Sequence, residues 1–288
     1  MLKWARMSAK KGLYVSWFAL VLIIMCMLTW LFMVLRVSTE HTDEHVEHLV
    51  PKVVATHEFD ESSFTQGLEM HDADTVVVGT GQRGESRLYK RWLDGTELTS
   101  VDLDPAFFGE GITHYGDSIW QLTWQENTAI KRDATTLKEV TRVQYPGEGW
   151  GLCAQEDRLI MSDGTAELRV LDPETFVEQA RITVTLRGRE VESLNELECV
   201  GDSVYANVFG STKIVRIDMN DHHSDSAGTV TAVIDASGLE NRAAPNPENV
   251  LNGIAVVKDE QGDVVDNRFL LTGKRWPDMY EVEFVPAH

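Results

Sequence analysis

The chain is poor in cysteine and in positive charge, with 3 cysteines and 26 lysine or arginine residues among 288. Three thiols are too few for a disulfide-rich scaffold or a thiolate metal site. The 46 aspartate and glutamate residues bring the net charge to −20. No basic face is therefore expected, and we predict no nucleic-acid partner. We interpret the acidity as a contribution to solubility.

The sequence also lacks the short motifs of several enzyme classes. It contains no Gly-x-Ser-x-Gly, no His-Glu-x-x-His and no phosphate-binding glycine loop. These absences argue against an α/β-hydrolase, a zinc protease and a P-loop nucleotidase. We expect no metal or cofactor to be required for catalysis.

One long apolar run stands near the start of the chain. Residues 12–35 form an almost wholly apolar segment of 24 residues, enough for a helix to cross a bilayer of roughly 30 Å. Four basic residues precede it and acidic residues follow, so the positive-inside rule predicts a cytoplasmic N-terminus. We expect a cytoplasmic segment over 1–11, a retained single-pass signal anchor over 12–36, a polar connector over 37–50, and one periplasmic or lumenal domain over 51–288.

Two of the three cysteines, Cys153 and Cys199, lie in the exported domain, whereas Cys26 lies within the apolar run. In an oxidising compartment the two domain cysteines could form one disulfide. They could equally be small buried apolar residues, because free cysteine is often buried. The sequence leaves both alternatives open.

Five segments share a pattern, shown most clearly where Glu110 stands between two glycines and follows two phenylalanines. The segments are Phe64-Thr65-Gln66-Gly67-Leu68, Phe108-Gly109-Glu110-Gly111-Ile112, Glu148-Gly149-Trp150-Gly151-Leu152, Ser193-Leu194-Asn195-Glu196-Leu197 and Val250-Leu251-Asn252-Gly253-Ile254. Their fourth residues are separated by 44, 40, 45 and 57 residues. A period of roughly 40–45 residues is typical of a propeller with four strands per repeat.

Each segment is followed by apolar and alternating runs that predict short strands. The predicted second strands are 75–79, 118–123, 158–162, 203–207 and 268–272, the third strands are 87–92, 128–132, 167–171, 213–217 and 279–284, and the fourth strands are 97–103, 139–145, 177–185 and 229–234. The fifth repeat has no fourth strand, and the strand predicted over 52–59 is unassigned. We therefore predict an all-β, five-bladed β-propeller closed by its N-terminal strand, which also hides the free sheet edges.

In a propeller, the first strand of each repeat lines the central channel. The third residue of each segment lies on such a strand, so we predict a ring around the channel made of Gln66, Glu110, Trp150, Asn195 and Asn252. Glu110 is the only acid in the ring. Glycines and phenylalanines around it should desolvate the carboxyl and raise its pKa toward the working pH, as proton transfer requires. The competing interpretation is a structural carboxyl bonded to backbone N–H groups.

A second group of candidate side chains lies at the ends of the predicted second strands. It consists of Trp124, Phe209 and Lys274, and together with Trp150 its aromatic members are expected to form a wall of the channel. Lys274 could hold Glu110 or polarise a substrate carbonyl; alternatively, it could be solvated. The aromatics could instead pack between blades.

These motifs together resemble the plant- and bacterial-type glutaminyl-peptide cyclotransferases, also called glutaminyl cyclases or glutamine cyclotransferases. The matching pieces are FTQGL at 64–68, FGEGIT at 108–113, GWGL at 149–152, SDGT at 162–165, LNELE at 194–198, YANV at 205–208, LNGIA at 251–255 and TGKxWP at 272–277. They follow the family's order and cover nearly all of the predicted domain. The resemblance implies a five-bladed propeller, in agreement with the repeat count.

The resemblance implies a transferase that converts the N-terminal glutamine of peptides or proteins to pyroglutamate with release of ammonia. The family's essential general acid and base falls on Glu110. We expect Lys274 and Asn195 to assist catalysis, because they can hydrogen-bond the amide and the developing oxyanion. The expected substrate-binding residues are Phe64, Gln66, Phe108, Trp124, Trp150 and Phe209.

Phe209 departs from the family, whose members commonly carry tryptophan after Ala-Asn-Val. Some relatives hold a structural cation in the channel, but the sequence does not place its ligands here. We expect a monomer that contacts the membrane through its N-terminal helix. The alternative functions are an inactive propeller that binds peptides or proteins and, more distantly, a propeller hydrolase whose channel carboxylate acts on water.

Overall fold

A computed structural model describes residues Met25, Met27, Thr29, 46–220 and 227–287. Nearly all of the predicted cytoplasmic segment, signal anchor and connector therefore lies outside the described residues. Among the described residues, no helix is long and apolar enough to cross a membrane. The compact unit Val46–His288 is described below by itself.

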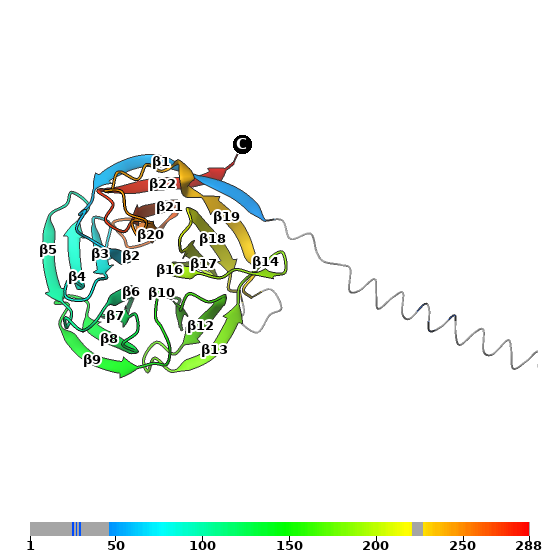
Figure 1. Cartoon of the computed structure of the whole chain (residues 1–288), viewed down its shortest axis with the longest axis horizontal. Coiled ribbons are helices and arrows are strands. Elements are labelled where there is room, and N and C mark those ends of the chain that lie inside the picture. Colours follow the sequence, from blue (N-terminus) through cyan, green and yellow to red (C-terminus); the bar gives the residue numbers. More distant parts are fainter. Residues whose placement is uncertain (1–24, 26, 28, 30–45, 221–226, 288) are drawn as a thin grey trace, which may run out of the picture. The chain divides into compact units, whose positions relative to one another are not determined.

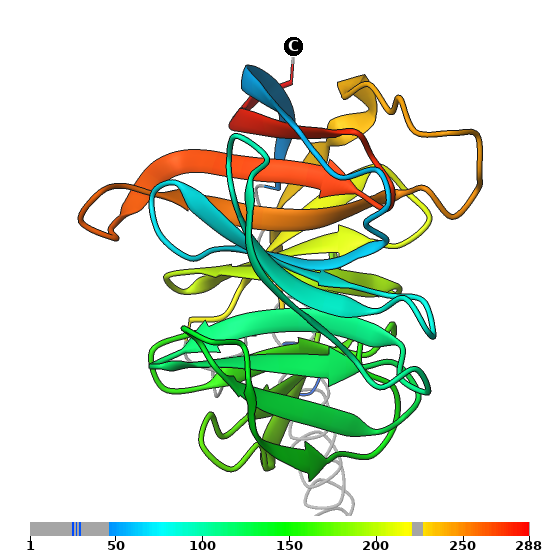
Figure 2. The same cartoon turned by 90° about the vertical axis from the view of Figure 1, so that its left-hand side faces the viewer.

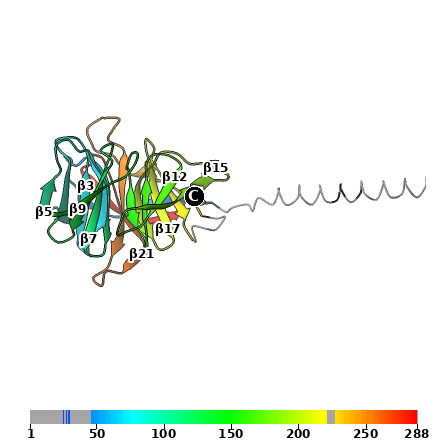
Figure 3. The same ribbon diagram turned by 90° about the horizontal axis from the view of Figure 1, so that it is seen from below.

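This unit is all-β and propeller-like, with sheets arranged in a ring around a common centre (Figure 1). Three of its sheets are four-stranded antiparallel meanders. They comprise β2 (Thr65–Met70), β3 (Thr75–Thr80), β4 (Arg87–Trp92) and β5 (Glu97–Asp102); β6 (Gly109–Tyr115), β7 (Ser118–Thr123), β8 (Thr128–Asp133) and β9 (Glu139–Gln144); and β10 (Leu152–Ala154), β11 (Leu159–Ser162), β12 (Glu167–Leu171) and β13 (Glu178–Thr183). Seen from below the ring, strands such as β7 and β17 run from one face of the ring toward the other (Figure 3).

The remaining long strands form one eight-stranded sheet of order β16-β17-β18-β19-β1-β22-β21-β20. Its members are β16 (Leu194–Val200), β17 (Ser203–Val208), β18 (Lys213–Asp218), β19 (Val230–Asp235), β1 (Glu47–Glu58), β20 (Leu251–Lys258), β21 (Val264–Gly273) and β22 (Asp278–Pro286). A two-stranded ribbon, β14 (Thr185–Leu186) with β15 (Arg189–Glu190), and a 3₁₀ turn, η1 (Ala236–Gly238), complete the described elements. The strands confirm the predicted runs within a few residues, apart from β21 and β1, which start four and five residues before their predicted runs.

The first and last strands of the unit lie side by side (Figure 2). Strand β1 pairs antiparallel with β22 from Leu49 opposite Pro286 to Glu58 opposite Asp278. The predicted pairing of an N-terminal strand with the last repeat is therefore confirmed. The strand begins earlier than predicted, at Glu47, within the range assigned to a polar connector. It does so because Val46 and Leu49 are buried and residues 47–49 pair in parallel with β19.

The apolar core lies between neighbouring sheets. Among the described residues, five buried clusters lie around the ring, four of them between neighbouring sheets and one between the two halves of the eight-stranded sheet. In one of them Trp120 from β7 packs against Phe176, which lies between β12 and β13 of the next sheet, with the ring centres 4.8 Å apart. Each sheet thus buries both faces, which explains why its middle strands are near-continuous apolar runs.

Close approach of the innermost strands explains the glycines of the repeated segments. A Cβ at Gly151 would lie 2.0 Å from the carbonyl oxygen of Asn195, and one at Gly111 would lie 2.7 Å from the nitrogen of Leu152. Only glycine fits such contacts without displacing backbone. In the fourth segment the equivalent residue is Glu196, whose side chain reaches the backbone N–H groups of Leu68 and Ile254.

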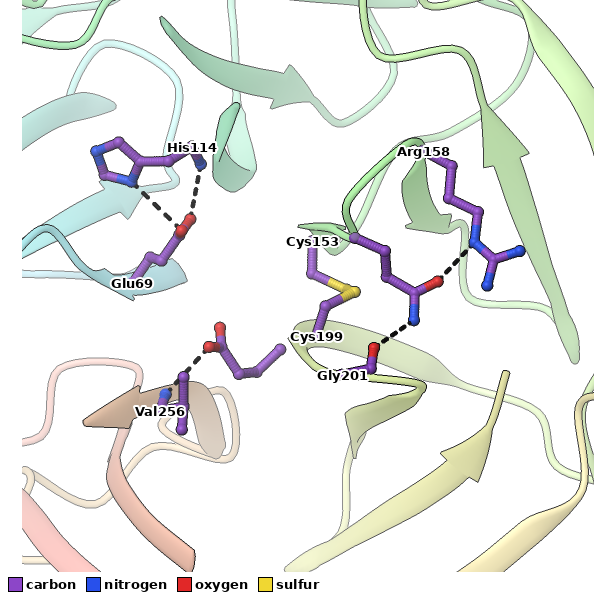
Figure 4. The surroundings of a disulfide bond; sticks show 9 residues. Glu69, His114, Cys153, Arg158, Cys199, Gly201 and Val256 are labelled. Atoms are coloured by element: carbon purple, nitrogen blue, oxygen red, sulfur yellow. Dashed lines mark hydrogen bonds and ion pairs between the residues drawn. A yellow bond between two sulfur atoms is a disulfide. The ribbon is translucent and has the colours of Figure 1, made fainter. Parts of the chain in front are cut away.

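The structure decides between the two interpretations of the cysteines. Cys153 on β10 and Cys199 on β16 form a disulfide that joins two sheets, with their Cα atoms 5.4 Å apart (Figure 4). They are 46 residues apart in the sequence. A cross-link of this kind stabilises a fold by about 2–4 kcal/mol, mainly by restricting the unfolded chain.

Candidate active site

A cavity of about 200 Å³ opens where the inner strands begin. All nine predicted site residues line it, although they come from every sheet of the ring. The lining residues are Phe64, Gln66, Gln82, Phe108, Glu110, Trp124, Trp150, Asn195, Phe209, Glu248 and Lys274. The fifth member of the predicted ring, Asn252, is fully buried behind this lining.

Glu110 stands at the second position of β6 and is buried, with 4% of its surface exposed. Gln66 Nε2 donates a hydrogen bond to its Oε1 at 2.9 Å. Asn252 Nδ2 in turn donates to Gln66 Oε1 at 3.1 Å and to the carbonyl of Thr65 at 3.0 Å. This chain fixes the Gln66 amide with its NH₂ group toward Glu110. The carboxyl is therefore held by a side chain, and no backbone N–H bonds it among the described contacts.

Burial raises the pKa of the Glu110 carboxyl well above its usual value. The positive charge of Lys274 acts against this shift, while the negative charges of Glu148 and Glu126 add to it. The carboxyl consequently keeps its proton to a higher pH than an exposed glutamate. This agrees with the expectation drawn from its glycine and aromatic neighbours.

Lys274 follows β21 and is also buried, with 4% exposed. Burial lowers its pKa, against the opposing influence of Glu110 and Glu248. Its Nζ lies 4.8 Å from the centre of the Phe64 ring and 5.0 Å from that of Phe209. Within the described part of the chain no ion pair joins Lys274 to Glu110, and Lys274 lines the cavity.

The cavity wall is built from edge-to-face aromatic pairs. Phe108 contacts Phe64 with ring centres 6.1 Å apart and Trp124 with centres 5.5 Å apart. On the other side Trp150 and Phe209 meet at 5.6 Å. Phe209 is the least buried of these, with 43% exposed. Such pairs are rigid as well as apolar, so they exclude water from the carboxyl.

Two glycines make room for the wall. A Cβ at Gly81 would lie 2.3 Å from Cε1 of Phe108, and one at Gly164 would lie 2.7 Å from Cζ2 of Trp150. Gly164 also has φ +82°, a conformation that side-chain-bearing residues rarely adopt. Larger residues at either position would push an aromatic ring into the cavity.

Sequence reasoning missed three residues at the site. Gln82, with φ +88°, and Glu248 line the cavity, although neither belongs to a repeated segment. Glu148 lies behind the wall and accepts hydrogen bonds from Trp124 and Trp150. Its place in the third repeated segment was the available signal, but the segment does not reveal which side chains it meets.

The fold and the cavity together define a class of all-β, propeller-like proteins with a candidate enzyme site, in which the buried Glu110 carboxyl faces a small cavity lined largely by aromatic side chains. Comparison with known proteins specifies the class. The sequence profile of the family described as glutamine cyclotransferase matches residues 25–284. This chain belongs to that family.

Two relatives are similar over most of the chain. A glutaminyl-peptide cyclotransferase of Arabidopsis thaliana is 34% identical over 241 residues, which are 82% of this chain and 72% of that protein. The crystal structure of Myxococcus xanthus glutaminyl cyclase superposes with a TM-score of 0.74 at 33% identity. The match covers 84% of this chain and all of that one.

Proposed function

We propose that this chain cyclises the N-terminal glutamine of peptides or proteins to pyroglutamate and releases ammonia. Family membership supports the reaction. The observation that carries it is the buried Glu110 carboxyl, whose pKa is raised and which faces a cavity lined by amide, ammonium and aromatic groups. The cavity of about 200 Å³ matches one amino-acid side chain, with the remaining peptide outside.

In the first step, the α-amine nitrogen attacks the γ-carboxamide carbon and forms the new C–N bond. The Glu110 carboxylate takes a proton from that nitrogen. The carbonyl oxygen becomes an oxyanion, for which Asn195 and Lys274 supply N–H donors. Gln66 already donates one N–H to Glu110, so we propose that its role is to orient the Glu110 carboxyl.

In the second step, Glu110 returns the proton to the leaving nitrogen. The bond between the carbon and that nitrogen breaks, ammonia departs, and the lactam carbonyl re-forms. Glu110 is again a carboxylate, so the cycle balances without an added acid. The aromatic wall holds the substrate side chain folded toward its own amine, and such positioning contributes much of the rate.

No step of this mechanism uses a metal or cofactor. Within the described residues, no three histidine, cysteine, aspartate or glutamate side chains converge as a metal site would need. We therefore assign no ligands to the structural cation that some relatives hold.

We further propose that the ring counts five blades. The eight-stranded sheet divides into two four-stranded units, β16–β19 and β20–β22 with β1, joined only by the short parallel pairing of residues 47–49 with β19. Five apolar clusters among the described residues, one of them between these two units, support this count.

We also propose a membrane-anchored monomer with an extracytoplasmic catalytic domain over 51–288. The apolar run of residues 12–35, its basic flank and the disulfide support this topology. Protease protection of the domain in intact cells or vesicles tests it, and mass spectrometry of the mature N-terminus shows whether the anchor is retained. Cleavage by protease added to the cytoplasmic side would contradict it.

The reaction is tested by measuring ammonia release from a glutamine-initiated dipeptide amide, with and without a chelator. We expect turnover that resists chelation, together with a product lighter by one ammonia in mass spectrometry. Turnover lost on chelation would overturn the mechanism. A folded protein that binds the peptide without turnover would indicate a binding module, and cleavage of the peptide bond would indicate a hydrolase.

A further inference from the structure

Two indoles of the cavity wall share one carboxylate behind it. Glu148 Oε2 accepts a hydrogen bond from Trp124 Nε1 at 2.7 Å and from Trp150 Nε1 at 3.0 Å. Its other oxygen, Oε1, accepts from Gln125 Nε2 at 3.0 Å. Trp124 follows β7, whereas Trp150 precedes β10, so the carboxylate joins the walls contributed by two neighbouring sheets.

The backbone reinforces this arrangement. The N–H of Gly149, next to Glu148, donates to the carbonyl of Trp124 at 3.0 Å, and the N–H of Gly111 donates to that of Trp150 at 2.7 Å. Each tryptophan main chain is thus fixed, and the remaining freedom of each indole is rotation about its side-chain bonds. An indole has a single polar atom, the Nε1–H donor, and Glu148 engages it in both rings.

This geometry decides what the two rings can offer a substrate. With both N–H groups bonded to Glu148, the rings present carbon to the cavity and donate nothing to the amide or oxyanion. We infer that Glu148 is a positioning residue for the cyclisation: it locks the Trp124 and Trp150 indoles in the orientation that folds the glutamine side chain against its amine. The inference rests on the proposed function.

Glu148 has a second influence, through its charge. Its hydrogen bonds with Gln125, Trp150 and Trp124 lower its pKa despite partial burial, so it is ionised at neutral pH. That negative charge helps to raise the pKa of Glu110. The other groups that influence or are influenced by the Glu110 carboxyl are Lys274, Glu126 and Tyr145. Glu148 therefore acts on the reaction through shape and through charge, and two variants separate these effects.

Glu148→Gln keeps an oxygen that can accept both indoles, and Gln125 can rotate its amide to match the new NH₂ group. Only the charge is removed, so we expect KM within about threefold of the wild type and an acidic limb of kcat shifted to lower pH.

Glu148→Ala removes the acceptor as well. We expect its KM to rise about tenfold or more, with a smaller fall in kcat, because two charge-assisted hydrogen bonds are lost. Glu85→Gln, at an exposed acid outside the cavity lining, controls for the loss of one charge.

Tryptophan fluorescence reads the indole positions without relying on turnover. We expect Glu148→Ala, and neither Glu148→Gln nor Glu85→Gln, to shift the emission maximum and to increase quenching by a neutral solute. Unchanged emission in the alanine variant would overturn the inference even if the wild type were inactive. If the wild type cyclises glutamine but Glu148→Ala keeps its KM, the positioning role alone is wrong. If the wild type releases no ammonia, the proposed function falls separately.

Discussion

Glu110 and Glu196 are both buried carboxyls on innermost strands, and burial raises the pKa of each well above its usual value. They stand one position apart in the repeated segments, Glu110 before a glycine and Glu196 in place of one. Glu110 is held by one side-chain amide and faces the cavity. Glu196 is held by two backbone N–H groups, of Leu68 at 3.3 Å and Ile254 at 2.8 Å, and does not line the cavity.

The difference shows that a raised pKa does not by itself identify a catalytic acid. Glu196 matches the structural interpretation considered for Glu110, because its oxygens bond to two other inner strands, β2 of another sheet and β20 at the far end of its own sheet. Its neighbour Glu198 is similar, since it accepts from the N–H of Val256 at 3.1 Å. Glu196 and Glu198 accept hydrogen bonds from backbone N–H groups of other inner strands, whereas Glu110 faces the cavity.

The largest expected effect separates the two carboxyls by activity. Glu110→Gln removes the group that carries the proton, so kcat/KM for a glutamine-initiated dipeptide should fall by about 10²–10⁴-fold. Ammonia release measures it, and circular dichroism checks that the fold is retained. Glu196→Gln is the matched substitution and should keep kcat within about threefold, since its carboxyl does not touch the cavity. Comparable losses in both variants would remove the distinction.

The next prediction compares the two carboxyls by their effect on stability, where Glu196 is expected to matter more than Glu110. Glu196→Ala leaves the N–H groups of Leu68 and Ile254 buried without their acceptor, so the free energy of unfolding should fall by about 3 kcal/mol. Urea denaturation at pH 7 measures it. Glu110→Ala leaves only the Gln66 amide to find another partner and should cost less. A larger loss in the Glu110 variant would contradict the structural role assigned to Glu196.

A smaller effect concerns the charges that set the pKa of Glu110. Lys274 opposes the raised pKa of Glu110, so Lys274→Met should raise that pKa further. Glu110 must be ionised to accept a proton, and the acidic limb of the kcat–pH profile should therefore move to higher pH. Profiles at saturating substrate test this, with Lys52→Met, at an exposed lysine paired with Glu283, as the control. A limb that stays or moves to lower pH would rule out this coupling.

The smallest effect concerns the family departure at position 209. Phe209→Trp enlarges a side chain of the apolar wall that is itself 43% exposed, so we expect KM to fall by only about two- to threefold. Initial rates over a range of peptide concentration measure it. An increased KM would mean that the larger ring obstructs the cavity that Phe209 and Trp150 share.

Much of the fold was predictable because it rests on local pattern. Four of the five aligned segments need glycine where the inner strands approach one another closely, and this made the repeat period visible in the sequence. The runs between the segments are apolar or alternating, as expected of strands, so the strands were visible as well. The start of β1 was not visible, because Glu47 and His48 are polar and join the sheet through pairing with β19 and, at His48, through a backbone hydrogen bond from Ala287. Among the residues that line the cavity, those within repeated segments or at strand ends were predicted, whereas Gln82 and Glu248 lie in loops whose approach to the cavity depends on the ring.

The sequence by itself determined that a single acid, Glu110, would stand among polar and aromatic residues at equivalent places of a repeated unit. Repetition makes such positions equivalent, and glycines mark where the backbones converge. Only the tertiary structure decided that Cys153 meets Cys199, that Glu196 ties strands together, and that Glu148 holds two indoles. Each of these depends on which groups from different repeats come within a few ångströms, and no pattern within one repeat encodes that relation.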